Sequence, residues 1–103
     1  MKDRLKQFRE LLKEEKFFQA HEVLEEVWFP RRFEENNEIK LLKGLINGAV
    51  SFELLKRGRV VQSNKVWANY LKYRTLLYKI VSKDYNEYHK TVRKLDFLRK
   101  NKV

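Results

Sequence analysis

The sequence has 103 residues, of which 43% are hydrophobic and 14% aromatic, enough apolar surface to form one hydrophobic core. It contains no cysteine, which excludes disulfide bonds, thiolate metal sites and cysteine nucleophiles, and its formal net charge is +10. Three glycines and one proline are too few for the frequent turns of an all-β protein. We therefore expect an all-α fold: a single helical domain over residues 1–103, built as a compact array of about five helices.

Hydropathy gives no sign of a membrane-spanning or secreted protein. No apolar run approaches the length that spans a bilayer, and the first residues lack the hydrophobic stretch of a secretory signal. We therefore expect a cytosolic protein without a membrane partner.

Apolar residues recur at helical spacing in the first part of the chain. Asp3 can cap a helix that extends to about residue 15. A second helix covers about residues 17–28 and ends before Pro30. The polar residues 30–37 then form the longest expected loop.

A third helix is expected over about residues 38–57. Gly58 suits a left-handed cap at its end, and the positive charges of Lys56 and Arg57 suit the negative end of the helix dipole. These three residues together predict where the helix ends.

Two further helices are expected in the remaining sequence. The fourth covers about residues 61–81, where apolar residues continue as far as Leu77 and Val81, and the fifth covers about residues 85–99. Short connections favour antiparallel neighbours, so we expect the second, third and fourth helices at the centre of the array.

The net positive charge comes entirely from the second half of the chain. Residues 1–52 hold ten basic and ten acidic residues, whereas residues 53–103 hold fourteen basic and only four acidic ones. Lys65, Lys72 and Lys79 recur every seven residues, which predicts one exposed stripe on the fourth helix.

Two tyrosines, Tyr73 and Tyr78, lie near this stripe, and Lys83 extends it if the helix continues. A positive surface with nearby aromatic residues could follow a phosphate backbone. The alternative is an ordinary solvated face, because no helix-turn-helix, RNA-binding sheet or zinc finger signature accompanies the charge.

The second predicted helix carries polar residues on its apolar face. At 100° per residue, His21 and Glu25 fall inside the arc of apolar side chains, whereas Gln19 and Glu26 point to the opposite side and Glu22 lies on the border. His21 and Glu25 are four residues apart and can meet. We therefore expect this pair to be buried and hydrogen-bonded, with a larger loss of stability for Glu25→Ala than for Glu26→Ala.

Three interpretations of this pair are open. The first is a structural polar cluster, with the Trp28 indole and the Asn47 amide as further partners. The second is a ligand or catalytic pocket, since perturbed titratable groups concentrate at functional sites. The third is a metal site, because residues 21–25 superficially resemble the His-Glu-x-x-His zinc motif; Glu25 replaces its second His, so we assign no metal.

Two glycines, Gly44 and Gly48, stand four residues apart in the third predicted helix. Each costs about 1 kcal/mol relative to Ala in a helix interior, so close approach of another helix is the expected compensation. We expect the bulky side chains of the second helix to fill that groove. Asn47 lies between the glycines and either bonds to His21 or Glu25 or faces outward.

The stretch from Phe17 to Trp28, with its aromatic pair followed by Gln-Ala-His-Glu-Val-Leu-Glu-Glu-Val-Trp, closely resembles the signature of the bacterial and archaeal domain-of-unknown-function family 309. Lys43 to Ala49 and the Arg57-Gly58 pair echo two further features of that family, and the resemblance covers about residues 5–80. Gln19, Lys43 and Asn47 depart from the Glu and two Gln of the pattern. The resemblance implies a small all-α array and implies no activity.

From these observations we expect a non-catalytic binding module with an anionic partner such as nucleic acid, possible self-association, and no cofactor. The anion-binding candidates are Arg31, Arg32, Lys65, Lys72 and Lys79. The alternative is a small enzyme or metal-assisted hydrolase in which His21 acts as base or ligand, Glu22 and Glu25 orient it, and Arg31 or Arg32 neutralises the substrate. A cleft that opens the His21 and Glu25 side chains beside Trp28 would favour the enzyme.

Overall fold

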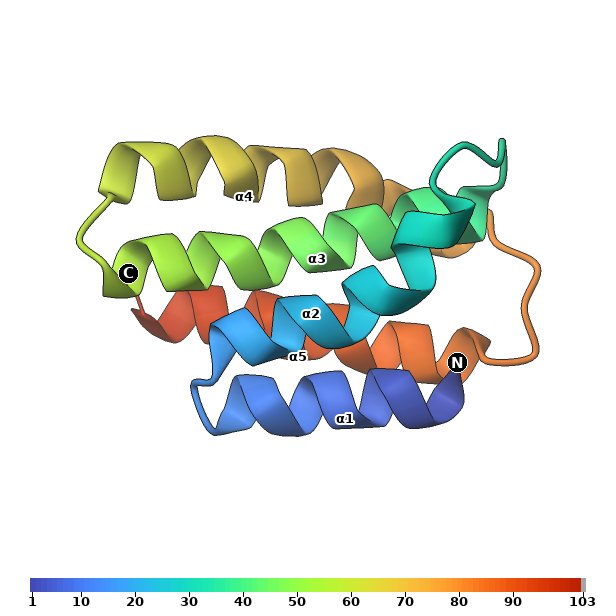
Figure 1. Cartoon of the computed structure of the whole chain (residues 1–103), viewed down its shortest axis with the longest axis horizontal. Helices are drawn as coiled ribbons and strands as arrows, with labels where there is room; N and C mark the ends of the chain where they lie inside the picture. Colours follow the sequence, from blue (N-terminus) through green and yellow to red (C-terminus); the bar gives the residue numbers. More distant parts are fainter. Residues whose placement is uncertain (103) are drawn as a thin grey trace.

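The fold is all-α, as the composition predicts. The structure is a computed structural model that describes residues 1–102, and within them the chain forms helices and loops without a β-strand. In chain order the elements are α1 (Lys2–Lys13), α2 (Phe17–Trp28), the 3-10 helix η1 (Phe29–Arg31), α3 (Asn37–Lys56), α4 (Val60–Arg74), the 3-10 helix η2 (Thr75–Tyr78) and α5 (Tyr85–Lys102) (Figure 1). None of these helices is long and apolar enough to cross a membrane.

α3 lies at the centre of the array. It packs against α2 on one side, α4 on another and α5 on a third, while α1 packs against α2 and α5 (Figure 1). The most extensive pairings are α3 with α4 and α2 with α3, which confirms the predicted central group. Ten residues of α3 are buried, and the face of α4 that points away from α3 is exposed.

The ends of α2 and α3 follow the sequence closely, whereas the start of α1 differs from the prediction. Asp3 lies inside the first turn of α1, and Met1 holds the cap position without a side-chain hydrogen bond. α3 is capped by Asn36, whose side chain accepts a hydrogen bond from the backbone N–H of Glu38. The last residue of α3 is Lys56. Gly58 follows two residues later with a φ of 76°, the left-handed conformation expected there.

The fourth helix is shorter than predicted. α4 ends at Arg74, the chain tightens into η2, and residues 79–84 form a loop. Leu77 enters the core, whereas Val81 is 98% exposed. The apolar spacing therefore includes Val81, which stays exposed, although Ile80 before it is partly buried against the core.

The two glycines of α3 do allow close helix approach, but not of α2. A Cβ added to Gly44 would stand 2.6 Å from the Cβ of Tyr73 on α4. A Cβ on Gly48 would lie 3.0 Å from a methyl group of Leu95 on α5. The expectation that α2 side chains fill this groove is therefore wrong, because the chain order does not reveal which neighbour covers which face of α3.

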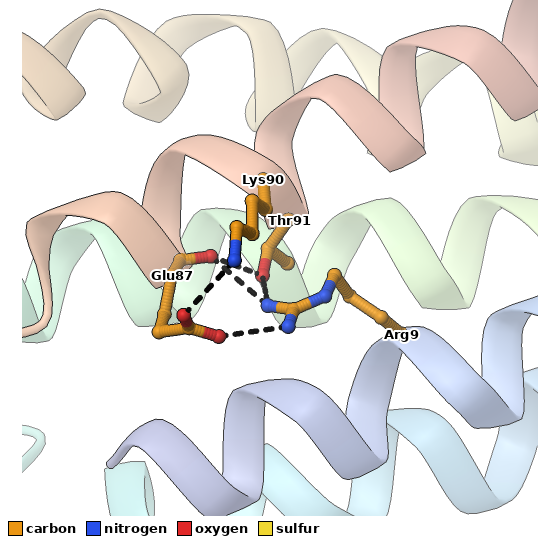
Figure 2. A network of polar contacts seen from close by, with 4 residues as sticks. All are labelled: Arg9, Glu87, Lys90 and Thr91. Carbon is orange, nitrogen blue, oxygen red and sulfur yellow. Dashed lines mark hydrogen bonds and ion pairs between the residues drawn. The ribbon is translucent and has the colours of Figure 1, made fainter.

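A polar network joins α1 to α5. Figure 2 shows the guanidinium of Arg9 reaching from α1 to the carboxylate of Glu87 at 2.8 Å, with further bonds to the Glu87 carbonyl and the Thr91 hydroxyl at 3.1 Å. Lys90 adds a longer contact of 3.4 Å to the same carboxylate. Hydrogen bonding from Arg9 lowers the pKa of Glu87 below its ordinary value.

Two buried tyrosines tie α5 to the other central helices. The hydroxyl of Tyr70 on α4 donates to Asp96 at 2.8 Å, and that of Tyr88 on α5 donates to Glu38 at 2.5 Å. Burial raises the pKa of both phenols, and the neighbouring carboxylates raise it further. These bonds satisfy polar groups at the edges of the core.

Candidate nucleic-acid interface

The side chains of His21 and Glu25 meet on α2 as predicted, but neither is fully buried. The Nε2 atom of His21 lies 3.5 Å from a carboxylate oxygen of Glu25, and its Nδ1 atom lies 2.8 Å from the Phe18 carbonyl oxygen. The His21 side chain is 17% exposed, whereas that of Glu25 is 47% exposed. The expectation of a buried, hydrogen-bonded pair is therefore wrong: His21 is partly buried, Glu25 is about half exposed, and they meet only at ion-pair distance.

The wider cluster around this pair does not assemble. Asn47 donates to the backbone carbonyl of Lys43 on its own helix at 2.9 Å, so it is not a partner of His21 or Glu25. Trp28 lies in a different cleft, where its ring packs 6.4 Å from that of Phe29.

Glu22, expected at the border of the apolar face, is exposed, and Glu26 differs from the expected arrangement. Glu22, Glu25 and Glu26 border a shallow depression beside Phe29 and Pro30. Glu26, expected to face only water, accepts a hydrogen bond of 2.6 Å from Arg4 on α1. Among residues 1–102, no three acidic or histidine side chains are grouped so that they could hold a metal ion.

The contacts of His21 and the groove beside it can be compared with what the hydrolase alternative requires. Both ring nitrogens of His21 face hydrogen-bond acceptors, and only the doubly protonated ring donates from both. The ring borders a small groove of about 260 Å³ lined mainly by apolar side chains such as Phe17, Phe18 and Val50. Neither Arg31 nor Arg32 lines this groove, and the arginine that does, Arg57, is paired with Glu53 at 2.8 Å.

A second cleft brings basic and aromatic side chains together. It has a volume of about 490 Å³ and lies between the η1 loop, the start of α3 and the end of α4. Figure 1 shows these three segments at the same end of the bundle. We call it the basic-aromatic cleft; its cations are Arg32, Lys40, Lys43 and Lys72, and its aromatic side chains are Trp28, Phe33 and Tyr73.

Tyr73 forms the centre of the basic-aromatic cleft. The ammonium groups of Lys43 and Lys72 lie 5.7 and 5.5 Å from the centre of its ring. Gly44 allows this arrangement, because any side chain there would collide with Tyr73 and hold α4 away from α3. Two helices thus present one cation each beside the same ring.

The two carboxylates that border the cleft are already paired with cations. Glu35 lies 3.2 Å from Lys40, and Glu34 accepts two hydrogen bonds of 2.9 Å from Arg31. These bonds lower the pKa of Glu34 and raise that of Arg31. Within the described residues, neither Lys43 nor Lys72 has a carboxylate at ion-pair distance, so their charges are available to a ligand.

Arg32 is held by stacking. Its guanidinium lies 3.7 Å from the ring centre of Phe29 and 4.5 Å from that of Phe33, and it donates to the Phe29 carbonyl at 2.6 Å. Phe33 is 84% exposed, so one aromatic face of this pair remains open to solvent. A planar cation beside open aromatic rings is a surface on which a base can stack.

The anion-binding candidates from the sequence fall into two groups. Arg32 and Lys72 line the basic-aromatic cleft together, which the sequence could not show. Arg31 is paired with Glu34, Lys65 lies on exposed α4 outside the cleft, and Lys79 follows η2 in a turn, so the three lysines do not share one helix.

Sequence reasoning missed Lys40 and Lys43. They stand three residues apart on the third predicted helix, which puts them on one face, and Lys43 precedes the glycine that α4 approaches. That spacing was the available signal; what hid it was the balanced charge of the first half of the chain.

No curated protein and no solved structure matches the chain. The family described as a domain of unknown function, DUF309, matches residues 5–66, which is more than half of the sequence. The matched region includes α2, most of which resembles the family signature, and the whole of α3, and it ends within α4. The chain therefore belongs to the DUF309 family.

Proposed function

We propose that this protein is a non-catalytic binding module for single-stranded nucleic acid and that the basic-aromatic cleft is its binding site. The observation that carries the proposal is the position of the Lys43 and Lys72 ammonium groups beside the Tyr73 ring, since neither is neutralised by a carboxylate among the described residues. Basic grooves with aromatic side chains are the common means of binding single strands.

The shape of the cleft favours a single strand over a duplex. A concave site of about 490 Å³ with three aromatic side chains can accept an unstacked base, whereas the bases of a duplex are stacked inside it. The ammonium groups of Lys43 and Lys72 line the same cleft and can neutralise phosphates next to that base. Base stacking supplies affinity without a strong sequence preference.

Charge outside the cleft supports the same partner. The excess of positive charge lies in residues 53–103, and exposed Lys65 and Lys79 lie before and after Lys72 along the chain. Such charges raise the rate of encounter with a polyanion even where they make no fixed contact.

The proposal can be tested with a fluorescently labelled oligothymidylate and anisotropy measurements. The Lys43→Glu, Lys72→Glu double variant should bind at least about tenfold more weakly than the wild type. The matched control is the Lys6→Glu, Lys13→Glu double variant, which makes the same change in net charge at exposed positions of α1. Binding of the wild type should weaken about ten- to a hundredfold between about 50 and 200 mM salt.

The control variant distinguishes binding at the cleft from a general effect of net charge. If both double variants lose affinity equally, net charge alone attracts the oligonucleotide and the cleft is not the binding site. If the wild type does not bind at low salt, the proposed function is wrong. Urea unfolding of each variant shows whether the substitutions leave the fold intact.

A further inference from the structure

We propose that a strand bound in the basic-aromatic cleft crosses η2 at Tyr78 and enters a second cleft between η2 and α5, where Arg93 and His89 contact its phosphates. This inference rests on the proposed function and deepens it, because it assigns a second subsite to the protein and a path over its surface to the bound strand.

The second cleft, which we call the α5 cleft, shares a wall with the first. It has a volume of about 300 Å³, and its polar lining residues are Arg74, Thr75, Tyr78, His89, Arg93 and Asp96. Lys72 and Tyr73 line the basic-aromatic cleft, and the next two residues along the chain line the α5 cleft. The end of α4 and η2 thus form a ridge with one cleft on each side.

Positive charge in the α5 cleft is available to a ligand. Asp96, the one carboxylate among its lining residues, accepts a hydrogen bond of 2.8 Å from Tyr70 and lies 3.1 Å from Arg74. Arg93 is exposed and, among the described residues, has no carboxylate at ion-pair distance. His89 adds a ring whose N–H can donate to a phosphate oxygen.

Tyr78 stands on the ridge between the two clefts. Its side chain is 77% exposed, although the neighbouring Leu77 is buried in the core. Lys79 follows directly and is also exposed. An aromatic ring that contributes little burial to the fold, beside a cation and between two basic clefts, offers a stacking surface where the strand crosses.

The α5 surface continues in the same character beyond the cleft. Arg93 also lines a shallow depression with Lys90, Lys94 and Phe97, and Phe97 is 60% exposed. The ammonium of Lys94 lies 6.0 Å from the centre of the Phe97 ring, a further pairing of a cation with an open aromatic face. A strand that reaches Arg93 therefore meets more positive charge ahead of it.

The test compares two labelled oligothymidylates of about 4 and about 16 nucleotides, short enough to occupy one cleft and long enough to occupy both. In anisotropy titrations at low salt, the wild type should bind the longer one at least about tenfold more tightly per molecule. Arg93→Glu and Tyr78→Ala should each remove most of that advantage while leaving the affinity for the shorter one within about twofold. Lys6→Glu on α1 is the control for the change in net charge.

The outcomes separate this inference from the proposed function. If both lengths bind through Lys43 and Lys72 but Arg93→Glu and Tyr78→Ala leave the length dependence unchanged, the crossing is wrong and the proposed function stands. If Arg93→Glu weakens both lengths equally, Arg93 is not a separate subsite and the crossing is again wrong. Absence of binding of either length to the wild type overturns both. Arg93 and Tyr78 are exposed, so urea midpoints close to that of the wild type are expected.

Discussion

Tyr73 packs so closely against Gly44 that a Cβ atom on this glycine would stand 2.6 Å from the Cβ of the tyrosine. Both atoms are fixed to the backbone, so rotation of the tyrosine side chain cannot relieve the contact. Because α4 lies this close to α3, the centre of the Tyr73 ring lies 5.7 and 5.5 Å from the ammonium groups of Lys43 and Lys72. The packing of the central helices and the geometry of the basic-aromatic cleft therefore depend on the same glycine.

Gly44→Ala should destabilise the protein. Overpacking at a tight contact costs about 1–3 kcal/mol, and the better helix propensity of Ala offsets about 1 kcal/mol of it, so a net loss of up to about 2 kcal/mol is expected in urea unfolding. Gly48→Ala is the control, because its new methyl group would meet the flexible end of Leu95 at 3.0 Å. A Gly44→Ala variant at least as stable as the wild type would show that α4 can move away from α3 without loss.

The ends of α1 and α3 share one hydrogen-bond pattern, but the left-handed residue that follows the helix differs between them: it is Glu15 after α1 and Gly58 after α3. After α3, the N–H groups of Gly58 and Arg59 donate to the carbonyls of Leu55 and Leu54. After α1, the same two bonds form around Glu15, which has a φ of 60°. A left-handed conformation costs a residue with a side chain about 1–2 kcal/mol, and glycine adopts it freely.

The two positions give opposite predictions: introducing glycine at Glu15 should stabilise the protein, and removing glycine at Gly58 should destabilise it. Glu15→Gly should stabilise the protein by about 0.5–1 kcal/mol, since the relieved strain exceeds the entropy that glycine adds to the unfolded chain. Gly58→Ala should destabilise it by about 1 kcal/mol for backbone reasons alone, because nothing lies within 4 Å of the new methyl group. Thermal or urea unfolding measures both changes. A loss in the Glu15 variant would mean that contacts of its side chain outweigh the strain.

The network between α1 and α5 predicts a dependence of stability on acid pH. The folded-state pKa of Glu87 lies below its unfolded value because Arg9 hydrogen-bonds to the carboxylate. The contribution of the ionised Glu87 to the free energy of unfolding is therefore complete above the unfolded-state pKa of about 4.3. It is lost as the pH falls through the folded-state pKa. The difference in urea midpoint between wild type and Arg9→Met should be largest near neutral pH and shrink below about pH 4.

Lys90→Met is the control for this experiment, because Lys90 contacts the same carboxylate from an exposed position at 3.4 Å. Its substitution should change the midpoint less at every pH. Part of the Arg9→Met effect should persist in acid, since the bonds of Arg9 to the Glu87 carbonyl and to Thr91 do not require an ionised carboxylate. A difference that is constant from neutral to acid pH would mean that the ion pair contributes nothing.

Local signals in the sequence predicted most of the secondary structure. α2 begins and ends at the predicted residues, and the end of α3 at Gly58 follows from its left-handed cap. Both depend on residues within one or two turns. The end of α4 was missed because Val81 continues the apolar spacing, and spacing alone does not show that Val81 stays exposed.

The site could be predicted only in part, because it is formed by helices far apart in sequence. Lys72 was singled out from spacing along one helix, but its partner Lys43 belongs to α3 and meets it only through the Gly44 contact. Conversely, the helical wheel placed Glu25 on an apolar face without showing where that face ends. Neither contact can be derived from the periodicity of a single helix.

The neighbours Glu25 and Glu26 provide a last test of these contacts. Periodicity alone predicts a large loss for Glu25→Ala and almost none for Glu26→Ala. In the structure, Glu25 is half exposed and 3.5 Å from His21, whereas Glu26 accepts a hydrogen bond of 2.6 Å from Arg4, which joins α1 to α2. Exposed pairs contribute about 0–1 kcal/mol, so both losses should be below about 1 kcal/mol, and that of Glu26→Ala should be the larger.

A double-mutant cycle isolates the contact between the helices. Combining Glu26→Ala with Arg4→Met should give a coupling energy of about 0.2–1 kcal/mol in urea unfolding, whereas combining Glu25→Ala with Arg4→Met should give none. The hydrogen bond from Arg4 to the Val23 carbonyl does not enter the coupling, because Glu26→Ala leaves it in place. A loss above about 2 kcal/mol for Glu25→Ala would mean that its carboxylate is buried with His21 in solution. The structural interpretation of the pair would then be favoured, because the hydrolase alternative requires a cleft that opens both side chains, and Glu25 does not line the groove that His21 borders.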